Sequence, residues 1–227
     1  MCTNYTSATP HHLLPLNGLG PASWPDGGWP EEAHPGYLAP IWVAPPKGEN
    51  GMQGRLARFG LVPRWCRMPR RRQRWAGHLQ RALRDREDKP SFRDAWREKR
   101  FAVVPMLNYL SPAGKADGRC DGALSAPMDS PMLAAALHER WVQPETGEAV
   151  HSFTLLTTNA DAHPLLNRMH RPGDEKRQLR LLEAPRALDW LRESPWGALD
   201  WLGAQPPVDL VGQAAPLRED PQGALPF

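Results

Sequence analysis

The sequence predicts a single globular domain of short strands and short helices joined by long loops. The chain has 227 residues, of which 41% are hydrophobic, and this suits one large domain with a real core. Its 26 prolines and 19 glycines form about a fifth of the chain, well above ordinary use, which argues against a helical bundle. No change in composition divides the chain, so residues 1–227 are predicted to form one domain.

The individual elements follow from local patterns. Residues 10–46 contain nine prolines, and this part of the chain, up to about residue 50, is predicted to be irregular polypeptide wrapped on the core. Residues 67–74 form a predicted basic loop, and residues 111–131 form a loop rich in Gly, Ser, Pro and Asp. Ser91 and Asp94 form a candidate capping box. Strands are predicted at 54–61, 101–106 and 152–158, and helices at 91–99, 161–169, 187–191 and 198–202.

Positive charge is concentrated in one segment. The net charge is +3, yet residues 55–86 contain eleven arginines and one acidic residue, Asp85, so this segment carries +10 and the rest −7. Such an asymmetric field favours a polyanionic partner, although a solvated face is the alternative. Phe59, Trp65 and Trp75 are interspersed with the arginines, and basic grooves with aromatic side chains are typical of single-stranded nucleic acid binding.

The three cysteines indicate neither a disulfide framework nor a metal site. Cys2, Cys66 and Cys120 are widely spaced and contain no CxxC pair. The first residues lack a charged leader and an apolar segment, so a cytoplasmic protein with reduced cysteines is expected. No apolar run is long enough for a membrane span, and a monomer without cofactor or metal is expected, because the His11–His12 pair has no evident partner ligands.

Cys2 is the most unusual feature of the sequence. Removal of Met1, which is common before a small residue, would leave an α-amine and a thiol on adjacent carbons. These groups titrate near ~8 and ~8.5, so both reactive forms are accessible near neutral pH. The pair can act as a nucleophile with a built-in base, or it can condense with an aldehyde to an imine that the thiol closes to a thiazolidine. A frayed terminus without a chemical role is the alternative.

His170 is the candidate proton carrier for such a nucleophile. It lies in the segment MHRPGDEKR, after a predicted strand and a predicted short helix. A loop histidine can serve as general acid or base near neutral pH, although most lone histidines are ordinary surface residues.

Five segments, taken in order, resemble the SOS-response-associated peptidase family (SRAP), whose members process abasic sites in DNA. They are MCTNY at the N-terminus, HPGYLAP at 34–40, RFGLVPRW at 58–65, KPSFRDAWREKRFAVVP at 89–105 and FTLLTTNADAHPLLNRMHRPGDEKR at 153–177. Phe59 stands in place of the first Trp of the family signature Trp-Gly-Leu-x-Pro-x-Trp. The resemblance spans most of the chain and implies an α+β fold, with antiparallel barrel-like sheets flanked by short helices and long loops.

The resemblance also implies a chemistry. Met1 is removed by the protein's own peptidase activity, and Cys2 forms a thiazolidine crosslink with the ring-opened aldehyde of an abasic site in single-stranded DNA. The family's catalytic histidine corresponds to His170. Its DNA groove corresponds to Arg58, Trp65 and Arg171, with Arg81 and Arg84 as further candidates.

The sequence departs from the family pattern at three functional positions. The family's Asn corresponds to Gln80, which keeps an amide at longer reach. Its Glu corresponds to Ser111, which cannot act as a carboxylate base, so Asp117 or Asp121 in the following loop are candidates to substitute. Its early Arg corresponds to Asn4, which removes one phosphate contact.

Three functions therefore stay open. The first is an active crosslinking protein for single-stranded DNA with abasic sites, based on Cys2, His170 and the arginine-rich segment. The second is a catalytically impaired relative that only binds DNA, based on Ser111 and Gln80. The third is a thiol-dependent peptidase or amidase, which leaves the arginine-rich segment without a role.

Overall fold

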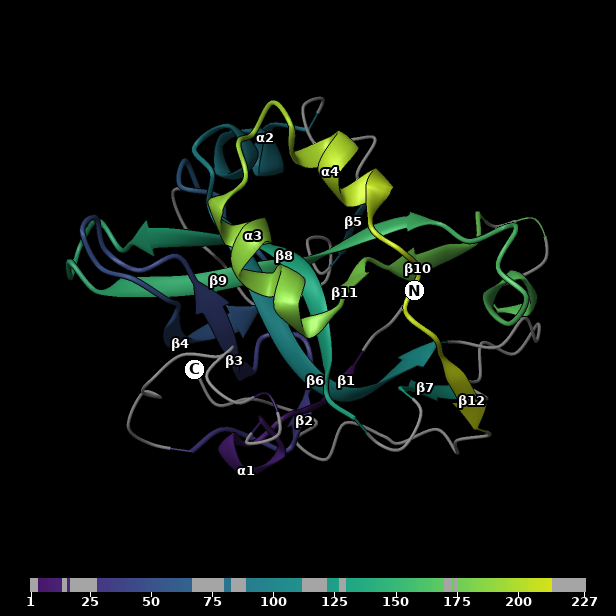
Figure 1. The fold of residues 1–227 in the computed structure, drawn as a ribbon. Helices are drawn as coiled ribbons and strands as arrows, with labels where there is room; N and C mark the ends of the chain where they lie inside the picture. Colours follow the sequence, from purple (N-terminus) through teal and green to yellow (C-terminus); the bar gives the residue numbers. More distant parts are fainter. Residues whose placement is uncertain are drawn as a thin grey trace.

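The computed structural model shows an α+β fold in which one highly curved sheet dominates (Figure 1). It describes residues 4–13, 16, 28–66, 80–82, 89–111, 122–126, 130–169, 173 and 175–213. The strands are β1 (Tyr5–Ser7), β2 (Glu32–Ala33), β3 (Leu38–Val43), β4 (Gln53–Phe59), β5 (Gln80–Ala82), β6 (Phe101–Ser111), β7 (Gly122–Ser125), β8 (Met132–Val142), β9 (Ala149–Asn159), β10 (Arg177–Leu179), β11 (Leu181–Leu182) and β12 (Val211–Gln213). The helices are α1 (Pro10–Leu13), α2 (Pro90–Arg97), α3 (Ala187–Arg192), α4 (Ala198–Ala204) and the 3-10 turns η5 (Leu166–Arg168) and η6 (Ala184–Arg186).

Part of this sheet closes on itself as a five-stranded barrel. The ring runs β3–β4–β9–β8–β6 and returns to β3, where Trp42 pairs with Val103. Every contact in the ring is antiparallel except β4–β9, which is parallel and places Phe59 opposite Phe153. Closure gives every ring strand a neighbour on both sides, with the β3–β6 and β4–β9 contacts each limited to two residue pairs. The predicted α+β class with antiparallel barrel-like sheets is confirmed.

Small side chains fill the interior of the barrel around two aromatic rings. Alternation along β6 points Ala102 and Val104 inward and Phe101 and Val103 outward, as the period of two in a strand requires. The interior is rich in alanine, and this leaves room for the rings of Phe59 and Phe153 to stack with centroids 5.3 Å apart. The interior is therefore a packed core and not a channel.

Aromatic side chains join the helices to the outer wall of the barrel. Phe101 stacks on Trp190 of α3 at 4.2 Å, and Trp96 of α2 meets Phe101 edge-on at 5.4 Å. Trp190 also donates its indole N–H to the carbonyl of Ala102 at 2.9 Å, so its buried polar atom is satisfied. Figure 1 shows α3 lying across β6 and β8. Several of the ten tryptophans thus serve the core.

The two ends of the barrel differ. At one end lie the carboxyl ends of β4, β6 and β9, together with the start of β1, because β1 runs antiparallel to β6. We call this the carboxyl end. At the other end the chain turns between β3 and β4 and between β8 and β9, and we call this the hairpin end.

Most predicted elements are present, but several expectations are corrected. The capping box is wrong, because Lys89 is the N-cap of α2, no side chain caps it, and Ser91 lies inside the helix. The predicted helix at 161–169 is wrong, because only η5 is helical there. The predicted loop at 111–131 contains β7.

The irregular segment predicted at residues 10–46 contains a barrel strand, β3, despite Pro40 at its centre. A proline has no N–H to donate, so it weakens a strand that must pair with neighbours on both sides. Pro40 is tolerated because β6 pairs with β3 only at Trp42 and Val43, so Pro40 has a ladder neighbour on one side. Beside β3 the segment also contains α1 and β2.

Candidate functional site

The predicted site residues differ in how much of them the structure describes. Side chains are described for Ser111, Arg58 and Trp65. For Gln80 and Arg81 the structure describes the backbone in β5 and not the side chain. Cys2, His170, Arg84, Arg171, Asp117 and Asp121 lie outside the described residues.

The start of β1 and the end of β6 lie side by side at the carboxyl end. Tyr5 pairs with Tyr109, and the N–H of Leu110 donates to the carbonyl of Asn4 at 3.1 Å. On its other side the end of β6 pairs with β7, where Ser111 lies opposite Gly122. Asn4 is 5% exposed and Ser111 is 2% exposed. Asn4, which is two residues after Cys2 in the sequence, therefore lies beside the end of β6 that carries Ser111.

The carboxyl half of β9 brings two further predicted positions to the same end. Beyond its contact with β4, β9 pairs in parallel with β5, where Gln80 lies opposite Leu155 and Arg81 opposite Leu156. After β9 the chain passes through η5 to Met169, whose N–H donates to the carbonyl of Leu166 at 3.0 Å. The residue after Met169 in the sequence is His170. The described residues close to Cys2 and His170 in the sequence, Asn4 and Met169, thus both lie at the carboxyl end.

The segment Gly60–Cys66, which we call the signature loop, continues from β4 and is held by three hydrogen bonds to the barrel wall. Gly60, at a φ of 118° that favours glycine, donates to Phe153 O at 2.9 Å. The N–H of Val62 donates to Ser152 Oγ at 2.9 Å, and the indole of Trp141 donates to the carbonyl of Cys66 at 2.6 Å. The loop is therefore a fixed part of the barrel surface.

Trp65 projects from the signature loop into solvent. Its side chain is 58% exposed, and Nε1 donates a long hydrogen bond of 3.5 Å to Pro90 O. A large, exposed aromatic ring on an anchored loop has the form of a stacking platform for a base. This placement suits the predicted DNA contact of Trp65.

An ion network fixes the neighbouring residue of the same loop. Arg64 pairs with Glu98 at 2.7 Å and lies 3.6 Å from the buried carboxylate of Glu139. Arg100 donates to the same oxygen of Glu139 at 2.5 Å, as does the N–H of Arg140 at 2.9 Å. Burial raises the pKa of Glu139 to about 7, while the hydrogen bond from Arg140 and the charge of Arg64 act in the opposite direction. Glu139 thus links the loop to β8.

Arg58 lies on the outer face of β4, half-buried, beside the HPGY turn. Its guanidinium donates from Nη1 to Gly36 O at 3.2 Å. Burial lowers the pKa of Arg58, and the negative charge of Glu148 partly offsets this effect. Arg58 therefore lies between the turn and the signature loop, and only the exposed part of its side chain is available to a DNA strand.

Sequence reasoning missed a partly buried acid–histidine pair at the carboxyl end, formed by Glu32 and His34. The side chain of His34, 6% exposed, places Nε2 3.3 Å from Glu32 Oε2, and its ring centroid lies 5.3 Å from that of Tyr37. Because Ala33 pairs with Tyr5, His34 comes next to Asn4 across the β1–β2 pair. The signal in the sequence is Glu-Ala-His, since residues two apart in a strand share a face.

His163, which also lies near this end, is engaged structurally. Its Nδ1 accepts hydrogen bonds from the N–H groups of Leu165 and Leu166 at 3.2 and 3.1 Å and so caps η5. Burial lowers the pKa of His163. An Nδ1 that accepts two backbone hydrogen bonds is not free to shuttle a proton, so His163 is an unsuitable alternative to His170.

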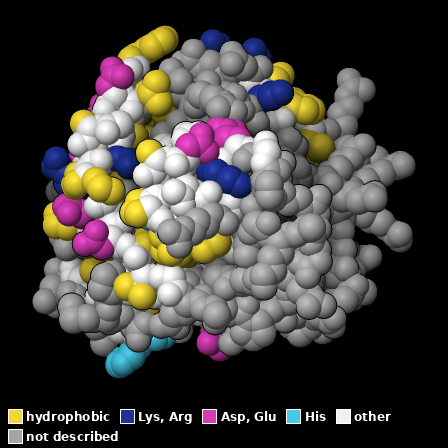
Figure 2. Space-filling model, turned by 90° about the vertical axis from the view of Figure 1, so that its right-hand side faces the viewer, with side chains coloured by type: hydrophobic (Ala, Val, Ile, Leu, Met, Phe, Trp, Pro, Cys, Tyr) yellow, Lys and Arg dark blue, Asp and Glu magenta, His cyan; other side chains and the backbone are white. Residues whose placement is uncertain are grey.

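The arginine-rich segment is described only in part. Side chains are described for Arg55, Arg58 and Arg64 among its eleven arginines. In Figure 2, which faces the carboxyl end, the described basic and acidic side chains are interspersed. Within the described ranges no cluster of three or more His, Cys, Asp or Glu could hold a metal ion, and no helix is long and apolar enough to cross a membrane.

Comparison with solved structures places this fold among known ones. A protein from Bordetella bronchiseptica is 22% identical with a TM-score of 0.79, covering 95% of this chain and 100% of its own. A protein from Bacteroides thetaiotaomicron is 17% identical with a TM-score of 0.72, covering 96% and 93%. A phage-related protein from Bordetella bronchiseptica is 14% identical with a TM-score of 0.64, covering 96% and 95%. These likenesses show the fold alone.

Comparison with sequence families identifies the chain. No curated protein matches it. The model of the SOS response associated peptidase (SRAP) family matches residues 2–207, which is most of its length. The chain therefore belongs to the SRAP family, and this membership supports a function related to DNA damage and an interaction with DNA.

Proposed function

We propose that this protein binds single-stranded DNA and forms a covalent crosslink between Cys2 and the aldehyde of an abasic site. The proposal is supported by two described residues, each close in sequence to a catalytic candidate, which both lie at the carboxyl end. Asn4, two residues after Cys2, lies beside Leu110 and Ser111, and Met169, one residue before His170, follows β9 at the same end. Since consecutive Cα atoms are ~3.8 Å apart, the chain keeps the Cα of Cys2 within about 7.6 Å of that of Asn4.

The reaction needs no cofactor and no change of oxidation state. The protein removes Met1, and the freed α-amine of Cys2 adds to the aldehyde carbon and expels one water to form an imine. The thiol then adds to the same carbon, so that a C–S bond forms and the thiol proton passes to nitrogen. The product is a thiazolidine, one water lighter than its components, and His170 carries the protons.

The carboxylate that the family supplies from the position of Ser111 needs a replacement. Ser111 is buried at the end of β6, opposite Gly122 of β7, and has no carboxylate. The Glu32–His34 pair lies next to Asn4 on the other side of β1 and supplies both a carboxylate and an imidazole. We assign it the assisting acid–base role, with the amide of Gln80 on β5 orienting the sugar.

DNA contacts are assigned to basic and aromatic residues outside the catalytic group. Trp65 supplies the exposed ring on the signature loop, and Arg58 supplies a half-buried cation beside it. Arg171 follows His170 in the sequence, and Arg81 and Arg84 belong to the arginine-rich segment.

The protein acts as a cytoplasmic monomer with one domain over residues 1–227, of which the family model matches 2–207.

The test is a denaturing gel of the protein mixed with an oligonucleotide that carries one abasic site. Wild type and the matched thiol control Cys66→Ser should give a band that survives denaturation, and Cys2→Ala should give none. A band that persists in Cys2→Ala would contradict the mechanism. Loss of the band in Cys66→Ser, with the band kept in Cys2→Ala, would mean that the thiol at position 66 reacts instead.

A DNA-binding relative without crosslinking is the second candidate, and the observation in its favour is the buried serine at the family's carboxylate position. It predicts salt-sensitive binding of single-stranded DNA with no denaturation-resistant band, because phosphate contacts release counterions. A thiol-dependent peptidase or amidase would show turnover of peptide substrates that is lost in Cys2→Ala.

A further inference from the structure

A cluster of basic side chains occupies the hairpin end of the barrel, away from the proposed crosslinking site. Arg55 extends from β4, His138 and Arg140 extend from β8, and His151 extends from β9. Arg140 and His151 are paired residues in the β8–β9 register. His138 is two residues from Arg140, so the two side chains share a face. We call these four residues the hairpin-end cluster.

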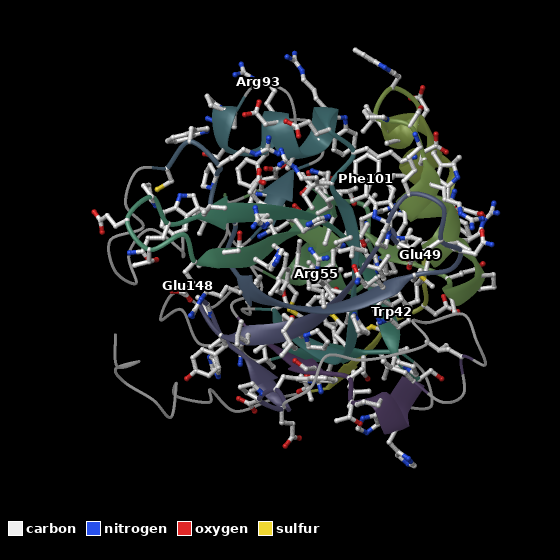
Figure 3. All side chains as sticks on the ribbon, turned by 90° about the vertical axis from the view of Figure 1, so that its left-hand side faces the viewer. Trp42, Glu49, Arg55, Arg93, Phe101 and Glu148 are labelled. Atoms are coloured by element: carbon white, nitrogen blue, oxygen red, sulfur yellow. The ribbon has the colours of Figure 1, made fainter. Side chains whose placement is uncertain are left out.

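This cluster lies over the interior of the barrel. Along β8 its face continues inward through Ala136 and Ala134, and along β9 it continues through Phe153 and Leu155, all of which belong to the inner core. Figure 3 looks at the hairpin end and shows Arg55 near the centre of the strands. The cluster therefore closes the interior at this end, with exposed Arg140 toward solvent and His138 beneath it.

Among described residues, the side-chain contacts of Arg55 are to groups other than carboxylates. Arg55 Nη2 donates to Gln53 Oε1 at 2.9 Å, and Arg55 Nη1 lies 3.3 Å from His151 Nδ1, so both contacts are to uncharged groups. None of the described acidic residues forms an ion pair with Arg55 or Arg140. Burial, and then the like charge of Arg140, lowers the pKa of Arg55.

His138 adds an unsatisfied buried atom to this arrangement. Its Nδ1 is inaccessible to solvent and has no hydrogen-bond partner among the described residues. Most buried polar atoms in proteins have a partner, so an exception calls for an explanation. Burial first, and then the charges of Arg55 and His151, lowers the pKa of His138, so its ring belongs to the same electrostatic group.

We propose that the hairpin-end cluster binds a phosphate-type oxyanion, with Arg55, Arg140 and His151 as direct ligands and His138 as the floor. Guanidinium groups hold phosphate oxygens by paired, charge-assisted hydrogen bonds, and a bound dianion would cancel the repulsion between the two arginines. Two sources share this chemistry: a free phosphate ion, and a phosphodiester of a nucleic acid that extends beyond the carboxyl end.

The first test measures thermal unfolding of the full chain with increasing inorganic phosphate, against sodium chloride at equal ionic strength. Wild type should show a phosphate-specific rise in Tm that saturates. Arg55→Gln and Arg140→Gln should lose it, and Arg192→Gln, an exposed arginine at the end of α3, should keep it. A rise of equal size with chloride, or in Arg55→Gln, would overturn the proposal.

A second measurement on the wild type does not depend on the folding of any variant. Phosphate should shift the side-chain ¹H–¹⁵N signals of His138 and His151 and leave those of His163, which is engaged in capping η5, in place. Movement of all three to the same extent, or of none, would contradict a site at the hairpin end.

The source of the anion is decided with a short single-stranded oligonucleotide and a Cys2→Ala background, in which no crosslink forms. If DNA supplies the phosphate, Arg140→Gln should bind the oligonucleotide more weakly than Arg192→Gln, with a salt slope smaller by about one unit. If a free ion supplies it, the two variants should bind the oligonucleotide equally, while phosphate still raises the Tm of the wild type and of Arg192→Gln but not that of Arg140→Gln. In both cases the Arg55→Gln variant that keeps Cys2 should still form the crosslink. Failure of the anion-site proposal can therefore be told apart from failure of the proposed function.

Discussion

The imidazole of His138 should make the stability of the folded protein depend on pH. Burial, followed by the charges of Arg55 and His151, lowers the pKa of His138 from 6.5 to about 3. Above pH 6.5 the ring is neutral in both the folded and the unfolded chain. Below it, the unfolded chain binds a proton that the folded protein excludes until about pH 3. Stability is therefore lost as the pH falls from 6.5 toward 3, and it is fully present above 6.5.

The magnitude follows from the width of this window. At pH 5, which is 1.5 units below the pKa of 6.5 in the unfolded chain, the loss in free energy of unfolding is about 2 kcal/mol. Because His138 is partly exposed, this value is an upper bound. Urea unfolding followed by tryptophan fluorescence, at pH 7.5 and pH 5 without phosphate, measures it. Wild type should lose up to about 2 kcal/mol more than His138→Gln, since other titrating groups are common to both. Equal losses in the two proteins would refute the reasoning.

Three further substitutions test other parts of the structure. Trp141→Phe removes the N–H that holds the signature loop and should cost about 1 to 2 kcal/mol in urea unfolding, whereas Trp196→Phe, 87% exposed, should cost less than about 0.5 kcal/mol. Trp65→Ala should weaken binding of single-stranded DNA by about 1 to 3 kcal/mol in fluorescence anisotropy with unchanged Tm, and an unchanged affinity would exclude base stacking on this ring. Glu32→Gln should slow crosslinking by about 100-fold on a timed denaturing gel without altering DNA affinity, and an unaltered rate would remove the Glu32–His34 pair from the mechanism.

Local patterns were sufficient to predict the strands that alternate clearly. β4 and β9, and the first half of β6, follow the hydrophobic pattern of the sequence, and α3 and α4 follow the two copies of ALDWL. β8 was not predicted, because its run Met-Leu-Ala-Ala-Ala-Leu favours a helix by propensity. Pairing on both sides, with β6 and β9, overrides that preference by burying the alanines inside the barrel.

The candidate site was predictable only where residues belong to a contiguous motif. The signature loop with Trp65 could be located in this way, and the structure adds its anchoring by Ser152 and Trp141 from strands far along the chain. The hairpin-end cluster has no motif, since Arg55 and His151 come together only through the register of β4 against β9. Closing a barrel brings such distant residues together, and local sequence patterns do not predict these contacts.

The most direct test of the account is the intact mass of the wild-type protein after reaction with an oligonucleotide that carries one abasic site, measured beside Cys2→Ala. The account predicts a species equal to the protein without Met1 plus the oligonucleotide minus one water, absent from the variant. Retention of Met1, or DNA binding by a des-Met protein whose mass never increases, would contradict it.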